Sequence, residues 1–193
     1  MNKKTKLILN SDRIAILGMP ALGKSVISKS IQNATGLPLV HLDQVQAEYV
    51  WPPGFSDAFL KRYLCEVAKP QWIIEGTQLE TAPYAHRLDH SDRIVYIRGT
   101  PEESAQRVYD RSLNIKNGIE ERHGCYDDNK SNVDELNNEL FEKVEQFMHW
   151  IITGLPKKYE KLERELFSHH HAKTIFIESR EELTALQDDL RSH

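Results

Sequence analysis

Four residues near the N-terminus have types and a spacing that suit one kind of chemistry. Gly18, Gly23, Lys24 and Ser25 form the pattern G-x-x-x-x-G-K-S within the segment IAILGMPALGKSVISKSI. The N–H groups of such a glycine-containing loop can wrap around an anion, and a helix that begins after the second glycine directs its partial positive charge at the same anion. A lysine in this place reaches nucleotide phosphates, and a serine hydroxyl can bind Mg²⁺. The pattern therefore predicts a site for a nucleoside triphosphate.

The sequence on either side of the pattern fits this interpretation. The apolar run from Arg13 to Leu17 predicts a strand that ends at Gly18, and the apolar spacing that follows predicts a helix that ends at Gly36. The alternative is an ordinary strand, turn and helix with an incidental lysine. If the loop binds phosphates, we expect all of it to contribute: Gly18, Met19, Pro20, Ala21, Leu22, Gly23, Lys24, Ser25 and Val26.

Length, charge and cysteine content limit the classes of protein. A chain of 193 residues fits one compact domain, which we expect to span residues 1–193. A net charge of −4 provides no general attraction for nucleic acid or anionic lipid, so we expect no direct nucleic-acid partner. Two cysteines, Cys65 and Cys125, are too few for a disulfide framework and lack metal-binding spacing, which favours the cytoplasm. No apolar stretch is long enough for a membrane span or a signal peptide.

The rest of the chain alternates predicted strands and helices. Short apolar runs predict four more strands, at residues 37–43, 72–76, 93–98 and 173–179. Capping patterns at Thr100 and Ser179 mark the starts of two of the helices. Such alternation predicts an α/β fold with a parallel sheet and helices on both faces. Ligands of such sheets bind at the carboxyl ends of the strands, where the sequence places Gly18, Asp43, Glu75 and Arg98.

Residues 112–132 interrupt this alternation. The segment is polar, contains basic residues and two glycines, and offers few candidates for a core. Apolar residues on one stripe then predict a long helix from Val133 to Ile151, and a shorter helix follows from Lys157 to Phe167. A basic loop beside a nucleotide site is typical of a lid that closes and excludes water, so we interpret 112–132 as a lid segment.

Together these motifs resemble the adenylate-kinase-like P-loop kinases. The resemblance depends on the P-loop, a strand that ends in HLD, the segments WPPGF and WIIEG, a helix carrying Arg107 and Arg111, and the sequence HGC in the lid segment. Among these kinases, the chain is most similar to the branch of DNA topology modulation proteins. The resemblance spans most of residues 14–150 and implies a three-layer P-loop NTPase fold with a five-stranded parallel sheet of order 2-3-1-4-5.

The resemblance also implies an activity: a kinase that uses ATP and Mg²⁺ to phosphorylate a small-molecule acceptor, as a monomer or homodimer. It implies catalytic roles for Lys24, Asp43, Arg107 and Arg111, with Asp43 orienting the acceptor hydroxyl or a metal-bound water and the arginines clamping phosphates. Ser25 and Asp43 would hold the metal. The residues implied in acceptor binding are Asp43, Glu75, Arg87 and Arg122.

Four departures from the family pattern keep a second hypothesis open. Ala21 stands where the family usually has a further glycine, and Val26 stands where a second hydroxyl residue is common. Glu75 and Thr77 replace a common Asp and Asn. These changes are compatible with a nucleotide-binding regulatory module that has lost turnover. The helix arginines could equally form a solvated face paired with nearby carboxylates. The identity of the acceptor is not readable from the sequence.

Overall fold

The structure is a computed structural model, and it describes residues 2–47, 56–79, 81–119 and 133–192. Its centre is a sheet of five strands in the order β2-β3-β1-β4-β5. All neighbouring strands run parallel. The strands are β1 (Arg13–Gly18), β2 (Leu39–His41), β3 (Trp72–Glu75), β4 (Arg93–Ile97) and β5 (Thr174–Ile177). The predicted class, number of strands and strand order are confirmed.

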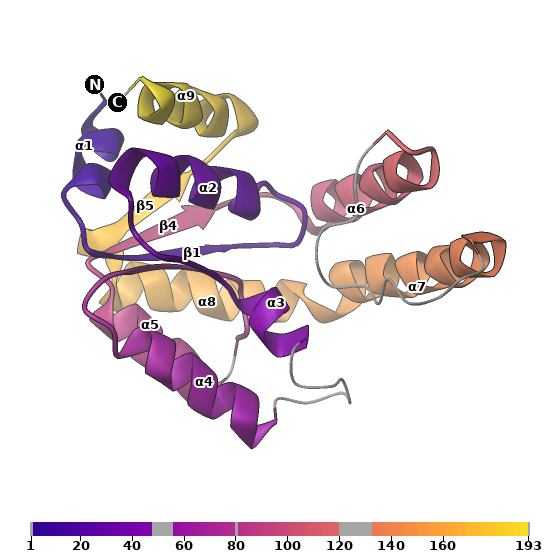
Figure 1. Ribbon diagram of the computed structural model, residues 1–193, viewed down its shortest axis with the longest axis horizontal. Helices are drawn as coiled ribbons and strands as arrows, with labels where there is room; N and C mark the ends of the chain where they lie inside the picture. The colour runs from indigo at the N-terminus through magenta and orange to yellow at the C-terminus, as the bar shows by residue number, and fades with distance from the viewer. Residues whose placement is uncertain (1, 48–55, 80, 120–132, 193) are drawn as a thin grey trace.

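Helices cover both faces of the sheet, as Figure 1 shows. One face carries α1 (Lys3–Leu9), α2 (Lys24–Thr35) and α9 (Arg180–Arg191). The other carries α4 (Asp57–Val67), α5 (Ala82–His90) and α8 (Pro156–His169). The short α3 (Leu42–Ala47) follows β2 directly, while α6 (Pro101–Lys116) and α7 (Val133–Gly154) extend away from one end of the sheet. A 3₁₀ turn at His171–Lys173 leads into β5.

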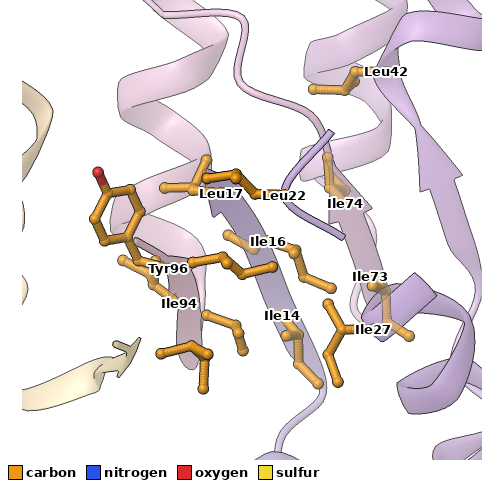
Figure 2. Close-up of a cluster of buried hydrophobic side chains, with 14 of the residues drawn as sticks. Ile14, Ile16, Leu17, Leu22, Ile27, Leu42, Ile73, Ile74, Ile94 and Tyr96 are labelled. Carbon is orange, nitrogen blue, oxygen red and sulfur yellow. The ribbon is translucent and has the colours of Figure 1, made fainter. Parts of the chain in front are cut away.

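The core lies on both sides of the central strands (Figure 2). Ile14 and Ile16 of β1 are fully buried, as is Ile27 of α2, which packs against the sheet. A strand that is buried on both faces reads as a continuous apolar run, which is why the sequence signal for β1 was strong. Leu22, in the loop between β1 and α2, is also buried, so the core itself holds this loop in place.

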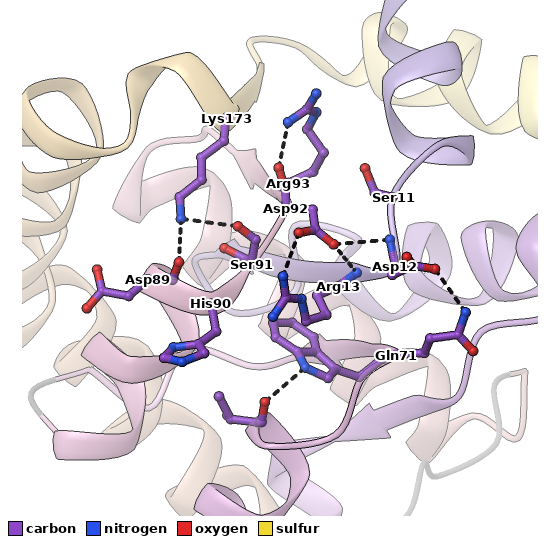
Figure 3. Close-up of polar contacts among 12 residues, drawn as sticks. Ser11, Asp12, Arg13, Gln71, Asp89, His90, Ser91, Asp92, Arg93 and Lys173 are labelled. Carbon is purple, nitrogen blue, oxygen red and sulfur yellow. Dashed lines mark hydrogen bonds and ion pairs between the residues drawn. The ribbon is translucent and has the colours of Figure 1, made fainter.

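Polar contacts connect the amino-terminal ends of the strands, at the end of the sheet opposite the glycine loop (Figure 3). The Asp92 carboxylate accepts hydrogen bonds from the backbone N–H and the guanidinium of Arg13, both at 2.9 Å, and joins the starts of β1 and β4. The Lys173 ammonium donates to the carbonyl oxygens of Leu88, Asp89 and Ser91 at 2.6, 2.9 and 3.1 Å, near the carboxyl end of α5. Cations there satisfy carbonyls that have no partner within the helix.

Several local predictions are confirmed and others are refined. The hydroxyl groups of Thr100 and Ser179 accept hydrogen bonds from the backbone N–H groups of Glu103 and Glu182, so both capping patterns start helices. Helix α1 was not expected. Strand β2 ends at His41, two residues before the predicted end.

Helix α6 continues to Lys116, so the first part of the predicted lid segment is helical, and residues 120–132 lie outside the described part of the chain. In the described residues, no helix combines the length and apolar character that a membrane span requires.

Candidate functional site

The loop between β1 and α2 has the backbone that a phosphate cradle needs. Gly18 has φ +146°, and a Cβ there would lie 2.7 Å from the carbonyl oxygen of Ile97, so only glycine fits. Gly23 is left-handed, with φ +95°, and forms the N-cap of α2 without a side chain over the helix N-terminus. The Lys24 ammonium donates a hydrogen bond to the carbonyl oxygen of Met19 at 2.9 Å and so bridges the loop.

Ala21 is the residue of this loop with an unusual backbone. Its φ of 56° makes it the one non-glycine residue with positive φ in the described part of the chain. A Cβ disfavours this conformation by about 1–2 kcal/mol. The loop therefore keeps the backbone shape that a glycine would adopt freely, although the sequence places an alanine there.

Side chains from distant elements fix the loop from outside. The carbonyl oxygen of Gly18 accepts hydrogen bonds from the hydroxyl groups of Thr77 and Tyr159, both at 2.9 Å. The hydroxyl of Ser104, in α6, donates to the carbonyl oxygen of Pro20 at 2.8 Å. These three hydrogen bonds use carbonyl oxygens of the loop. None of them occupies a loop N–H group, so the N–H groups can still donate to an anion.

Charged residues gather beside this loop. Lys24, Asp43 and Glu75 lie close enough to shift one another's pKa. Nδ1 of His41 lies 2.6 Å from Oε2 of Glu75, which is 5% exposed. Gln78 donates from Nε2 to Oδ1 of Asp43 at 2.7 Å. The structure therefore brings two predicted carboxylates and the predicted lysine to the carboxyl ends of β1, β2 and β3.

The electrostatics of this cluster follow from burial and opposite charge. Burial lowers the pKa of Lys24, while Glu75 and Asp43 act in the opposite direction. Burial raises the pKa of Asp43, although Lys24 opposes this shift. Burial would also raise the pKa of Glu75, but hydrogen bonds from His41 and Ser25 and the charges of Lys24 and His41 outweigh it, so this pKa lies below its usual value. Glu75 is thus ionised at neutral pH.

The residues of the cluster suit a hard divalent cation. Ser25, Asp43 and Glu75 offer hydroxyl and carboxylate oxygens, and Mg²⁺ typically uses one or two carboxylates with phosphate oxygens and water. The described residues contain no group of three or more His, Cys, Asp and Glu side chains arranged for a metal. The donor set therefore fits a cation that arrives with a nucleotide better than one held by the protein alone.

A cleft of about 850 Å³ opens beside the loop. Leu22 of the loop, the connection from β4 to α6 and the connection from β5 to α9 line it. Arg98 forms two 2.8 Å hydrogen bonds to the carboxylate of Glu178 at its wall, and Arg107 donates to Glu103 at 2.6 Å. Both arginines have acidic partners within the cleft, which supports the alternative of ion pairing for Arg107 as much as a phosphate contact.

The remaining predicted site residues lie in different places. Arg111 is half-buried one helical turn beyond Arg107 in α6, and Arg122 lies outside the described residues. Arg87, in α5, is fully buried and donates from Nη1 to the carbonyl oxygen of Gly76 at 3.0 Å. The structure therefore groups Arg107 and Arg111 on α6 and places Arg87 behind the end of β3.

Sequence reasoning missed several residues of this site. His41, Gln78 and Tyr159 contact Glu75, Asp43 and the loop carbonyl, respectively. The HLD sequence held a signal for His41, because a polar residue at the carboxyl end of a buried strand lies at the edge where ligands bind. The sequence held no such signal for Tyr159, because this residue lies 141 residues from Gly18 in the chain.

Comparison with solved structures finds similar folds among kinases. A shikimate kinase from Bacteroides thetaiotaomicron is 16% identical with a TM-score of 0.54, over 94% of this chain and 97% of that chain. A gluconokinase from Sinorhizobium meliloti 1021 is 14% identical with a TM-score of 0.48, over 94% and 92% of the two chains. A shikimate kinase from Acinetobacter baumannii in complex with shikimate is 12% identical with a TM-score of 0.48, over 97% and 96%. No family model and no curated protein matches the sequence.

The likeness to the first of these structures agrees with the class of fold that the sheet defines. Five parallel strands in the order 2-3-1-4-5, with helices on both faces and the glycine loop after β1, form the P-loop kinase fold. The particular resemblance to DNA topology modulation proteins is not confirmed by these comparisons and stays a prediction.

Proposed function

We propose that this protein is a kinase that transfers the γ-phosphoryl group of ATP to a hydroxyl group of a small acceptor in the cytoplasm. The observation that carries this proposal is the convergence of Lys24, Asp43 and Glu75 beside the glycine loop at the carboxyl ends of three strands. The fold shared with a shikimate kinase supports a small hydroxylated acceptor. Either a monomer or a homodimer is compatible with it.

Each residue of the cluster has a role in this proposal. The loop from Gly18 to Ser25 binds the phosphates, and Lys24 neutralises charge on the transferring group. Ser25 and Asp43 would hold Mg²⁺, which supplies charge neutralisation for the phosphates when it is bound. Asp43 orients the acceptor hydroxyl, and Gln78 fixes Asp43 by holding one of its oxygens. His41 and Ser25 keep Glu75 ionised, which maintains negative charge opposite Lys24.

The cleft and the arginines of α6 complete the proposed nucleotide site. The cleft adjoins the loop at Leu22 and has room for a nucleoside, so we place the base and sugar of ATP there. Arg107 lies at its wall and would exchange its bond to Glu103 for a phosphate, with Arg111 one turn away. Residues 112–132, with Arg122, remain a lid in this proposal.

An ADP-release assay tests the proposal against a panel of hydroxylated acids, sugars, nucleosides and nucleoside monophosphates. The variant Lys24→Ala should lose about 100-fold or more of the turnover, because it removes a preorganised charge from the transfer site. Lys29→Ala is the matched control, since Lys29 is an exposed lysine of the same helix and should leave turnover unchanged. Equal turnover in the wild type and Lys24→Ala would exclude this site.

The regulatory module without turnover remains the second candidate, and the ion pair of Arg107 favours it. A guanidinium that is paired with the Glu103 carboxylate does not contact a transferring phosphate. This function predicts that ATP binds, that Lys24→Ala weakens the binding, and that no acceptor of the panel raises ADP release above the rate with water.

A further inference from the structure

Pro20 and Ala21 are the central residues of a turn inside the glycine loop. The ring of a proline fixes its φ near about −65°, whereas Ala21 has φ 56°. A turn whose first central residue has negative φ and whose second has positive φ is of type II, and the second position of this turn usually requires glycine or asparagine. Ala21 therefore occupies a position that an alanine rarely takes.

A type I turn is the ordinary alternative for a Pro-Ala pair. The two turn types differ mainly in the orientation of the peptide group between the central residues. Turning this peptide over would carry Ala21 from positive to negative φ and would leave Pro20 at a first position that both turn types allow. Because alanine prefers negative φ, the turn by itself favours type I. A contact from outside the turn must therefore hold the peptide as the structure has it.

The hydroxyl group of Ser104, in α6, makes such a contact. It donates to the carbonyl oxygen of Pro20 at 2.8 Å, and Ser104 is 0% exposed, so water does not compete for this bond. The start of α6 is packed against the loop, because a Cβ on Gly99 would lie 2.7 Å from Cδ1 of Leu22. The hydroxyl is thus held beside the turn. A type I turn would move the carbonyl away and deprive a buried hydroxyl of this partner.

The orientation of this peptide decides which of its groups a bound anion meets. In a trans peptide the C=O and N–H groups point in opposite directions. Since the Pro20 carbonyl is turned toward α6, the N–H of Ala21 points away from α6. In the type I form the two groups exchange places, and a carbonyl oxygen with its negative partial charge would replace a donor. A loop that binds phosphate needs the donor.

We propose that Ser104 is a positioning residue that holds the Pro20–Ala21 turn in its type II form, so that the N–H of Ala21 donates to a nucleotide phosphate. The inference rests on the proposed function in one respect, that the loop binds a nucleotide. The strain at Ala21 and the contribution of one hydrogen bond are similar in size, so loss of the bond allows many molecules to adopt type I. The affinity for nucleotide then falls with the fraction of molecules that keep the competent loop.

Calorimetric titration with ADP and Mg²⁺ tests this role without turnover. Ser104→Ala should weaken the binding of ADP about fivefold to tenfold. Ser112→Ala is the matched control, because Ser112 is a buried serine of the same helix whose hydroxyl donates to the carbonyl oxygen of Val108 in that helix, at 2.8 Å. Thermal melting shows that both variants fold. Unchanged affinity in Ser104→Ala, or equal weakening in the control, overturns the inference.

A double-mutant cycle separates this role from a loss of packing at α6. Ala21→Gly removes the strain, and a Pro-Gly turn adopts type II without outside help. In a chain with Ala21→Gly, the further change Ser104→Ala should therefore weaken ADP binding by less than about twofold. Damage to the packing of α6 would weaken binding equally in both chains. Equal weakening with alanine and with glycine at this position overturns the inference.

Changes at Ala21 itself keep the test decisive if Ser104→Ala does not fold. Ala21→Gly should bind ADP at least as tightly as the wild type, and Ala21→Val about tenfold more weakly, because a β-branched residue tolerates positive φ less than alanine does. The opposite order overturns the inference.

The kinase proposal is decided separately by the ADP-release assay. Turnover that depends on Lys24, with ADP binding that does not depend on Ser104, overturns the inference and leaves the kinase proposal intact. ADP binding that depends on Ser104, with no acceptor that raises ADP release, supports the inference and argues against the kinase proposal alone. A wild type that does not bind ADP overturns the inference.

Discussion

At the scale of single residues, the backbone of Ala21 lowers the stability of the folded protein. Its left-handed backbone, φ 56°, is the conformation that glycine adopts without strain. Ala21→Gly should therefore raise the free energy of unfolding by about 0.5–1 kcal/mol, because the strain relieved exceeds the entropy that glycine adds to the unfolded chain. Urea denaturation measures this directly. Ala185→Gly, at an exposed position in α9, should change stability in the opposite direction.

We expect Asp43 to lower the stability of the fold at neutral pH while it contributes to the proposed turnover. Burial raises its pKa, so the folded state holds the Asp43 proton to higher pH than the unfolded state does, and stability falls as the pH rises through this interval. Asp43→Asn should therefore raise the melting temperature at pH 7 and lower turnover about 100-fold. The gain in melting temperature should disappear below the ordinary pKa of 3.8. A variant that melts earlier at pH 7 would contradict this account.

The residues of the site differ in how far the sequence could predict them. Gly18, Lys24 and Ser25 lie within eight residues of sequence, so a local pattern predicts that they form one site. His41 and Gln78 act through contacts with Glu75 and Asp43 across 34 and 35 residues of sequence, respectively. Such contacts exist only once the sheet has formed. A single sequence does not show which residues far apart in the chain become neighbours in space.

At the scale of elements, α1 supports one wall of the cleft. The Lys4 ammonium donates to the carbonyl oxygen of Phe176 at 2.6 Å and pairs with Glu182. Glu182 in turn accepts a 2.8 Å hydrogen bond from the backbone N–H of Glu178, which lines the cleft and holds Arg98. The chain of contacts thus runs from the N-terminal helix to the place where the base of ATP is proposed to lie.

Lys4→Met should therefore weaken nucleotide binding without touching the nucleotide. We expect the KM for ATP to rise about fivefold with little change in kcat, which corresponds to the loss of about one hydrogen bond. The ADP-release assay at varied ATP concentration measures both constants. Lys3→Met provides the comparison, because Lys3 is an exposed lysine of the same helix. An unchanged KM would show that α1 does not support the cleft.

The elements themselves were predictable where their signal was long or strongly apolar. Buried strands such as β1 and β4 and the capped helices α6 and α9 lie close to where the sequence places them. Helix α1 escaped because it has only seven residues, a length at which periodicity says little. Asp43 lies in the first turn of α3 rather than in a strand, since β2 has only three residues and α3 follows it directly.

At the scale of the molecule, alternation of strands and helices was sufficient to predict a parallel sheet with helices on both faces. Alternation alone permits several strand orders, so the order 2-3-1-4-5 depended on the family resemblance. This order places β1 in the middle, with β3 and β4 beside it, so the glycine loop meets Glu75 on one side and the cleft on the other. In the proposed function, this central strand lies between Glu75 on the acceptor side and the cleft proposed for the nucleoside.

Asp92, at the amino-terminal ends of β1 and β4, makes a pH-dependent contribution to the stability of the whole fold. Burial alone would raise the pKa of Asp92, but hydrogen bonds and charge from Arg13 outweigh it and lower this pKa. A lowered pKa contributes stability that is present above the unfolded pKa and is lost as the pH falls through the folded pKa. Asp92 therefore holds β1 and β4 together at neutral pH and ceases to do so in acid.

Asp92→Asn should reduce the free energy of unfolding by about 1 kcal/mol at pH 7, because it replaces charged hydrogen bonds to a partly exposed arginine with neutral ones. Urea denaturation at pH 7 and at successively lower pH measures the difference, which should shrink toward zero as Asp92 is protonated in the wild type. Asp188→Asn breaks an ion pair of similar type with Arg191 on the surface of α9, where both side chains are exposed, and should cost less than about 0.5 kcal/mol. A pH-independent difference would mean that Asp92 stabilises the sheet edge by its shape and hydrogen bonds rather than by its charge.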